Sequence, residues 1–374
     1  MTDREAYILL NMISGIGAAR FRALQEEFGS PSAIFEQTIN RLVAVKGINQ
    51  KIAEDLTSPG NPARLQRELD LADKGGTQII TPADPDYPEC LNHIYDPPLC
   101  LYCRGTLPEL GDGCVAVVGS RRPSRYGRKM TELLTGQAVA AGWKIISGLA
   151  YGVDAVAHKT AVDCGGITVA VLGGGLMRVH PQDNIPLARS IVDSGGAVVS
   201  EFPMEYPVNR QSFPRRNRIV AAMSAATLVV EAGLNSGALI TADLAAEQGR
   251  SVFAVPGQVD NELARGCHKL IRQGAKLTEN FEDILDDFEF LPGFSQPVEQ
   301  LSLGLDATIS DHTTIQLDPL EQRIVGLLES EEKTFDNLVA ELESGASELM
   351  AALMKLELQM VVSQSPGRLY SLRR

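Results

Sequence analysis

Residues 114–121 read Cys-Val-Ala-Val-Val-Gly-Ser-Arg, and their pattern indicates the class of fold. Five apolar residues in a row, three of them valine, are typical of a short strand buried on both faces of a parallel sheet. Gly119 then allows a tight turn, and a helical segment follows it. The stretch therefore predicts a strand, a turn and a helix, the unit from which α/β folds are built.

Five more apolar runs repeat this rhythm between residues 76 and 289. They are segments 144–146, 167–172, 197–199, 227–230 and 251–255. The segments between them are long enough to hold crossover helices. We therefore predict an α/β fold with a parallel sheet and helices on both of its faces.

The chain has 374 residues, which favours two or three domains. Residues 1–75 show helical spacing, and segments 14–20 and 45–51 look like the hairpins of helix-hairpin-helix units. These hairpins could bind phosphate or serve packing and protein contacts, because the region is nearly neutral. Residues 290–317 are predicted to be a linker, and residues 318–374 two helices followed by a β-wing.

The net charge is −13, which taken globally argues against nucleic-acid binding. Two strongly basic segments, which we call the basic islands, reverse that argument. Residues 113–131 carry five basic residues and no acid, residues 206–230 carry four arginines and no acid, and the rest of the chain therefore has a charge of −22. An acidic body with one focused basic cleft is suited to binding an extended polyanion.

Compartment and membrane attachment follow from other features of the composition. Six cysteines in a chain of this length exclude a disulfide scaffold. The longest apolar run, residues 219–230, is too short to span a bilayer, and the charged first residues do not resemble a signal peptide. We expect a cytoplasmic protein with no membrane partner.

Ligands of open α/β sheets bind at the carboxyl ends of the strands, so the loops there are candidate sites. Each of these loops also has an interpretation without a ligand. The first basic loop could be a solvated helix start, the second a surface loop, and Ser236 a simple helix cap. We expect the arginines of the basic loops to be exposed to a cleft, with Phe213 available to stack on a base. The candidate residues in these loops are Gly119, Ser120, Arg121, Arg122, Gly148, Gly173, Phe213, Arg215, Arg216, Asn217, Arg218, Ser236 and Gly237.

No catalytic residue, metal or cofactor is expected. Asp154 and His158 are spaced i,i+4 and could form a general base with its orienting partner, but we favour a supporting role, because no nucleophile accompanies them. Cys100 and Cys103 form a lone CxxC pair without the second pair that zinc requires, and we expect them in a strand. Arg178 replaces the last glycine of a dinucleotide-binding fingerprint.

In these loops the sequence resembles the DprA/Smf family of DNA-processing proteins over about residues 76–277. The resemblance rests on ordered motifs: residues 115–121, 147–150, 152–154, 171–173, 213–218, 230–232, 236–241 and 254–257. It implies an extended Rossmann fold, binding of single-stranded DNA and a homodimer. It also implies protection of incoming DNA and loading of RecA recombinase during natural transformation. By motif, DNA contacts carry over to Gly119, Ser120, Arg121, Phe213, Arg216 and Arg218.

The resemblance further implies a helical domain in front of the core and a winged helix behind it. Because residues 319–374 carry six basic and nine acidic residues, we expect this winged helix to contact protein rather than DNA. One alternative function stays open: a nucleotide-processing enzyme similar to nucleoside monophosphate phosphoribohydrolases, with Glu231 as its carboxylate. The Pro-Gly-Gly-x-Gly-Thr loop of such enzymes is absent after Val230.

Overall fold

The computed structural model describes residues 1–288, 319–328, 333–342, 349, 352–353, 355–356, 362–365 and 369–372. The chain divides into two compact units, Met1–Gln296 and Pro297–Arg374. The predicted linker, residues 290–317, lies outside the described residues and stays a prediction.

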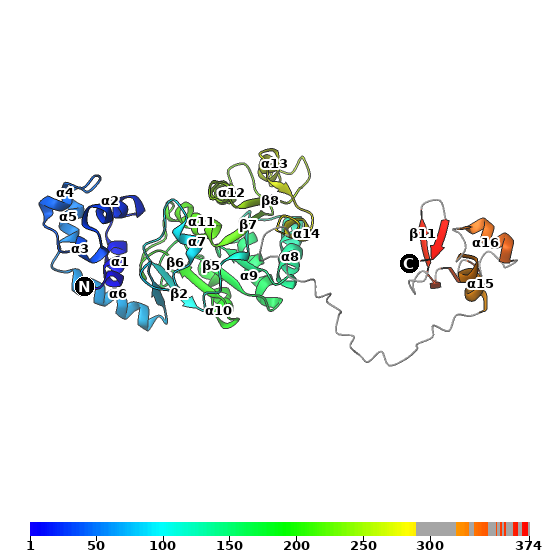
Figure 1. Cartoon of the computed structure of the whole chain (residues 1–374), viewed down its shortest axis with the longest axis horizontal. Coiled ribbons are helices and arrows are strands. Elements are labelled where there is room, and N and C mark those ends of the chain that lie inside the picture. The colour runs from blue at the N-terminus through cyan, green and yellow to red at the C-terminus, as the bar shows by residue number, and fades with distance from the viewer. Residues whose placement is uncertain are drawn as a thin grey trace. The chain divides into compact units, whose positions relative to one another are not determined.

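The first unit is built on a nine-stranded sheet with the order β1-β2-β6-β5-β4-β3-β7-β8-β9. Figure 1 labels strands β2, β6, β5, β7 and β8 of this sheet among the helices that surround it. The seven strands from β6 to β9 in this order run parallel, and β1 and β2 pair antiparallel at one edge. All six strands predicted for the parallel sheet are confirmed, and β2 stands where a strand was expected at Cys103, whereas β1 and β9 were not foreseen. The strands are β1 (Gln78–Ile80), β2 (Leu101–Gly105), β3 (Gly111–Val118), β4 (Lys144–Ser147), β5 (Thr168–Val171), β6 (Ala197–Ser200), β7 (Ser224–Val229), β8 (Ser251–Ala254) and β9 (Lys276–Leu277).

Helices cover both faces of the sheet, as its alternating side chains require. Val115 and Val117 of β3 pack with α8 (Arg125–Ala140) and α9 (Val153–Asp163). Ala116 and Val118 point to the other face, against α11 (Ser212–Ala222) and α12 (Gly237–Glu247). The fold is therefore a Rossmann-like α/β fold, as predicted. The remaining helices of the core are α7 (Glu89–Asn92), α10 (Ile185–Asp193), α13 (Arg265–Arg272), α14 (Glu282–Leu285) and the 3-10 turn η1 (Gln182–Asn184).

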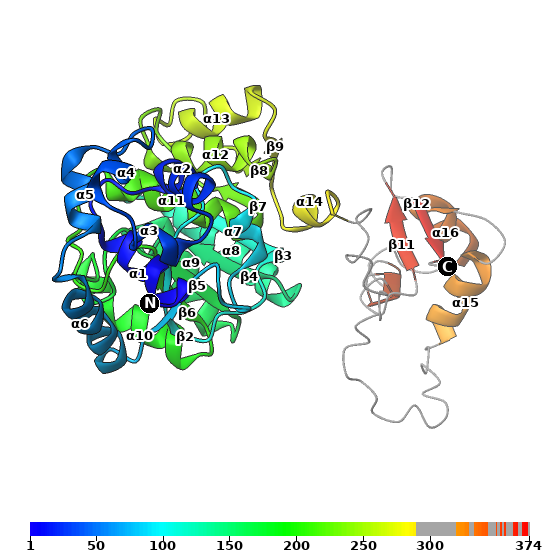
Figure 2. The same ribbon diagram turned by 60° about the vertical axis from the view of Figure 1, so that its left-hand side comes forward.

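The N-terminal helices lie beside the β1–β2–β6 end of the sheet and share a core with it (Figure 2). Leu9 and Leu10 belong to the same buried cluster as Tyr102 and Leu172 of the sheet region. The backbone N–H of Ala18, in the first predicted hairpin, donates to Asp96 Oδ1 at 3.3 Å. That hairpin therefore uses one of its N–H groups inside the protein. The helices are α1 (Asp3–Met12), α2 (Ala18–Phe28), α3 (Pro31–Ile34), α4 (Ile39–Val43), α5 (Gln50–Leu56) and α6 (Asn61–Lys74).

The second unit combines two described helices with a three-stranded antiparallel sheet of order β10-β12-β11. Ile324, Leu338, Leu353 and Tyr370 belong to its small core. The pair β11–β12 stands where the β-wing was predicted. The elements are α15 (Pro319–Leu328), β10 (Lys333–Thr334), α16 (Phe335–Leu342), β11 (Val362–Ser365) and β12 (Leu369–Leu372).

Among the helices that the structure describes, none is long and apolar enough to cross a membrane. The longest apolar run, residues 219–230, is divided between the end of α11 and strand β7. Its side chains are buried because both elements belong to the interior of the sheet unit.

Candidate nucleic-acid interface

A groove of about 520 Å³ opens where the strand order reverses at β3. Strands β4 to β6 lie on one side of β3, and strands β7 to β9 lie on the other side. The loops that follow β3, β4 and β7 therefore diverge at this point. This is the usual ligand position in an open α/β sheet. We call this site the basic groove. Eight predicted residues line it: Gly119, Arg121, Gly148, Phe213, Arg216, Asn217, Ser236 and Gly237.

Arg121 and Phe213 stand together in the basic groove. The Arg121 guanidinium lies 5.1 Å from the centre of the half-buried Phe213 ring, a cation–π contact. Arg121, Arg122 and Arg210 make no ion pair or side-chain hydrogen bond with any residue that the structure describes. Unpaired arginines around an aromatic ring suit a ligand that offers both phosphate and base.

Arg216 lies beneath the basic groove and is only 5% exposed, so the expectation that it is exposed is wrong. Its guanidinium donates to the carbonyls of Gly148, at 2.5 Å, and Val171. A Cβ at Gly148 would stand 2.5 Å from the guanidinium carbon, so only glycine leaves room for it. Burial lowers the pKa of Arg216 to about 10, and repulsion from Arg121 acts in the same direction. The nearby Asp154 carboxylate raises this pKa and so opposes part of the shift. Arg216 joins β4 and β5 to α11 and gives the groove floor its charge.

Arg218 and Arg215 turn away from the basic groove toward Glu201, so the expected exposure of Arg218 is also wrong. Two Arg218 nitrogens donate to the two Glu201 oxygens at 2.8 Å each, and its Nε donates to Asp96 at 3.1 Å. Burial alone would lower the pKa of Arg218, but Glu201 and Asp96 outweigh it and raise that pKa. Arg215 pairs with the same Glu201 carboxylate at 3.0 Å. A sequence cannot show this arrangement, because both acids come from other loops.

Asp154 and His158 support the loops, which confirms the favoured interpretation. Asp154 Oδ2 accepts from the backbone N–H groups of Gly148, at 3.2 Å, and Ala150, at 3.3 Å. His158 Nδ1 lies 2.7 Å from the Thr168 hydroxyl, and burial, with Arg216, lowers the pKa of His158 to about 3. The two side chains hold different strand ends in place and do not form a base with its orienting partner.

Glu231 is buried below the loop after β3. Its oxygens accept from the Ser124 backbone N–H at 2.8 Å and from the Ser124 hydroxyl at 2.5 Å. Ser124 caps α8 and accepts from the Gly127 N–H. Glu231 therefore holds the start of the helix that follows the first basic loop.

The α12 N-terminus forms the opposite wall of the basic groove. Ser236 caps it by accepting from the Ala238 N–H at 3.3 Å, and Asn217 Nδ2 donates to the Gly237 carbonyl at 3.3 Å. The positive end of an 11-residue helix thus faces the groove. Arg210, Asn235 and Thr241 also line it and were not among the predicted site residues. Arg210 could have been included, because it belongs to the second basic island.

The other predicted residues lie beside the lining. The Ser120 hydroxyl accepts from the Arg122 N–H at 3.1 Å and shapes the turn. Gly173 lies behind Phe213, where an added Cβ would stand 3.1 Å from the ring. Cys103 is in β2, as expected, and Cys100 directly precedes it; both are buried. Among the described residues, no group of three His, Cys, Asp or Glu side chains could hold a metal ion.

Three family models match successive parts of this chain. Residues 78–289 match the family described as DNA recombination-mediator protein A, residues 310–368 match the DprA winged helix domain, and residues 7–58 match the SAM-like helix-hairpin-helix tandem.

Individual relatives extend the match to the whole chain. Protein Smf of Synechocystis sp. is 32% identical over all of this chain and 99% of its own length. DNA processing protein DprA of Bacillus subtilis is 39% identical over 61% of this chain and 76% of its own. The solved structure of DNA processing protein A from Streptococcus pneumoniae is 33% identical, with a TM-score of 0.66 over 78% of this chain and 99% of that one. The chain thus belongs to the DNA recombination-mediator protein A family, the DprA/Smf proteins.

Proposed function

We propose that the basic groove binds single-stranded DNA and that the chain is a recombination mediator rather than an enzyme. The observation that carries this proposal is the pair of unpaired arginines, Arg121 and Arg210, that line the groove with Phe213 at the switch point of the sheet. In a chain of net charge −13, arginines without an acidic partner favour a polyanion as the ligand.

The groove suits a single strand better than a duplex. Arg121 and Arg210 can hold phosphates, and the α12 N-terminus adds backbone N–H groups. Phe213 can stack on a base only where that base is free, and the bases of a duplex are already stacked on one another. Phosphate contacts carry no sequence information, so binding should tolerate any sequence.

The larger role follows from the family. We infer that the chain protects incoming DNA in the cytoplasm during natural transformation, loads RecA onto it and works as a homodimer. The β9 edge of the sheet, where Leu277 is 48% exposed, is a candidate dimer face. Sedimentation of the wild type and of Leu277→Glu tests this face: a dimer that persists in the variant would rule it out.

We further propose four parts for the chain: the helical region 1–75, the DNA-binding core 76–289, the linker 290–317 and the winged helix 318–374. Deleting residues 290–374 should leave single-strand affinity nearly unchanged, because the basic groove lies wholly within residues 118–241. A large loss of affinity would assign DNA contacts to the winged helix.

The position of Glu231 speaks against the alternative, a nucleotide-processing enzyme. Such chemistry needs a carboxylate that faces the substrate. Glu231 is only 2% exposed, and both of its oxygens accept hydrogen bonds from Ser124.

Fluorescence anisotropy of a labelled oligothymidylate tests the proposal directly. Arg121→Ala should weaken binding strongly, whereas Arg215→Ala, which removes an arginine directed away from the groove, should weaken it far less. Equal effects of the two substitutions would contradict binding in the basic groove. Nucleoside monophosphate hydrolysis by the wild type, lost in Glu231→Gln, would instead support the enzyme.

A further inference from the structure

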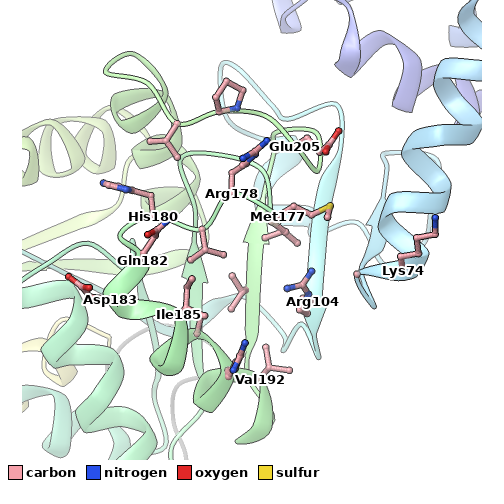
Figure 3. Close-up of a pocket in the computed structure, with 18 of the residues that line it drawn as sticks. Lys74, Arg104, Met177, Arg178, His180, Gln182, Asp183, Ile185, Val192 and Glu205 are labelled. Atoms are coloured by element: carbon pink, nitrogen blue, oxygen red, sulfur yellow. The ribbon is translucent and has the colours of Figure 1, made fainter.

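A second, larger cavity of about 1400 Å³ lies beside the basic groove. We call it the side cavity; it lies between the end of α6, strands β2 and β6, and helix α10 with the loop before it. Figure 3 shows Lys74 on α6 at one side, His180 and Asp183 on that loop at the other, and Arg104 and Ile185 between them. This volume exceeds the roughly 300–1,000 Å³ of most small-molecule pockets, so a single small molecule would fill only part of the side cavity.

The side cavity holds four cations without acidic partners: Lys74, Arg104, Arg178 and Arg189. The Nε of Arg104 is buried and has no hydrogen-bond partner among the described residues, although another of its nitrogens donates to Thr77 at 3.3 Å. This arrangement leaves positive charge without protein compensation at the centre of the cavity.

Two of the three acids in the side cavity are already engaged. Asp183 accepts from the Tyr151 hydroxyl at 2.7 Å, and Glu205 pairs with Arg67 at 2.7 Å. Only Asp193, at the far end of α10, makes no ion pair or side-chain hydrogen bond with a described residue. A hydrogen bond from a neutral hydroxyl does not neutralise a carboxylate, so Asp183 and Asp193 both count against the four unpaired cations, and the excess of cations favours an anionic ligand.

Apolar side chains lie between these charges. Leu176, Ile185 and Val198 line the side cavity, and Met177 is 49% exposed there. Tyr151 is 45% exposed in the wall and can offer its ring to a base. Cations together with apolar surface suit a nucleotide, whose base is flat and largely apolar on its faces and whose phosphate is charged.

The side cavity and the basic groove share a wall. The His180 ring, which lines the side cavity, lies 6.2 Å from the Phe213 ring, which lines the groove. The loop after β4 also contributes to both sites, through Gly148 in the groove and Tyr151 in the cavity. A chain leaving the groove past Phe213 therefore meets His180 and then Arg178.

We propose that the side cavity is a second subsite for the same DNA strand, taking the nucleotides that continue past Phe213 and holding their phosphates with Arg178, Arg189 and Lys74. This inference rests on the proposed function, because it needs a strand in the basic groove. On this proposal the DNA strand contacts the side cavity as well as the basic groove, and its path turns at Phe213.

The experiment is a length series of labelled oligothymidylates, from about 4 to 16 nucleotides, the range of site sizes known for single-strand binding folds. Four proteins are compared by anisotropy: the wild type, Arg178→Glu, Arg121→Ala and Lys159→Glu. Lys159 is an exposed lysine of α9 that pairs with Asp163 and lines neither site. Lys159→Glu therefore controls for the same change in net charge.

Arg178→Glu should bind the shortest oligonucleotides with the same affinity as Lys159→Glu. On the longer oligonucleotides, its affinity should lack the increase with length that Lys159→Glu shows. On long strands, the slope of log K against log salt should also become shallower by about 0.7 for each phosphate that the variant no longer binds. Two results would overturn the side-cavity subsite: equality of Arg178→Glu and Lys159→Glu at every length, or a loss for Arg178→Glu that is as large on short strands. If Arg121→Ala has no effect at any length, the proposed function itself fails.

Discussion

Arg218→Met should destabilise the sheet unit strongly, although Arg218 belongs to a basic loop. Arg218 is 7% exposed and Glu201 is 1% exposed, and they share two hydrogen bonds of 2.8 Å. Removing one partner of a buried ion pair costs about 3–5 kcal/mol, because the other charge stays buried, whereas an exposed pair contributes ~0–1 kcal/mol. Arg215, at 3.0 Å and half-exposed, compensates Glu201 only in part. We therefore expect a loss near the lower end of that range, about 3 kcal/mol.

Urea unfolding followed by tryptophan fluorescence measures this loss in the right part of the chain. Trp143 is the only tryptophan, and it is buried against Phe281, so its emission reports the sheet unit. The double variant Glu201→Met, Arg218→Met should regain most of the stability, because no charge is then left unpaired at Glu201. Arg122→Met, an exposed arginine of the first basic loop, should stay within about 0.5 kcal/mol of the wild type. If Arg218→Met is as stable as Arg122→Met but binds DNA poorly, Arg218 contacts DNA and the structural role assigned to it is wrong.

Three further results are expected. The wild-type slope of log K against log salt should be about −2 to −4 on single strands and shallower by about 0.7 in Arg121→Ala; a flat response would exclude phosphate contacts. Phe213→Ala should cost ~1–3 kcal/mol of single-strand binding and much less of duplex binding, measured by competition against labelled oligothymidylate; equal losses would contradict stacking. The pKa of His158 is lowered from 6.5 to about 3, so as the pH falls the unfolded state binds the proton before the folded state does. The free energy of unfolding should therefore decrease by about 1.4 kcal/mol for each pH unit as the pH is lowered from 6.5 to 3. His158→Gln should flatten this part of the curve, and an unchanged profile in urea titrations would show that another group is responsible.

Six of the seven parallel strands could be predicted from the sequence because each is an apolar run bounded by glycine or polar residues, whereas β9 (Lys276–Leu277) is too short to show one. Strand β1 has only three residues, and β2 contains Cys103 and Arg104, so neither shows such a run. β2 pairs antiparallel with β6, which lies about 100 residues further along the chain, and β1 pairs with β2.

The candidate site was predictable at the level of loops but not of single side chains. The basic islands and glycine turns pointed to the carboxyl edge of the sheet, where Arg121 and Phe213 do meet. The neighbouring arginines could not be separated by role, since Arg216 is turned toward carbonyls at the ends of β4 and β5 and Arg218 toward Glu201. Helical spacing places Arg215 and Arg218 on one side of α11, but nothing in the sequence shows which acid lies there.

The core shared by the N-terminal helices and the sheet has a consequence for synthesis on the ribosome. The helices end at Lys74, but their core partners Tyr102, Leu172, Val198 and Met204 are made later. At about 5–20 residues per second, the roughly 130 residues from Lys74 to Met204 take roughly 6–26 s. For that time the helices can pack on one another, but their apolar side chains that face the sheet have no native partner. The first part of the chain to be made therefore completes its packing only after Met204 has been made.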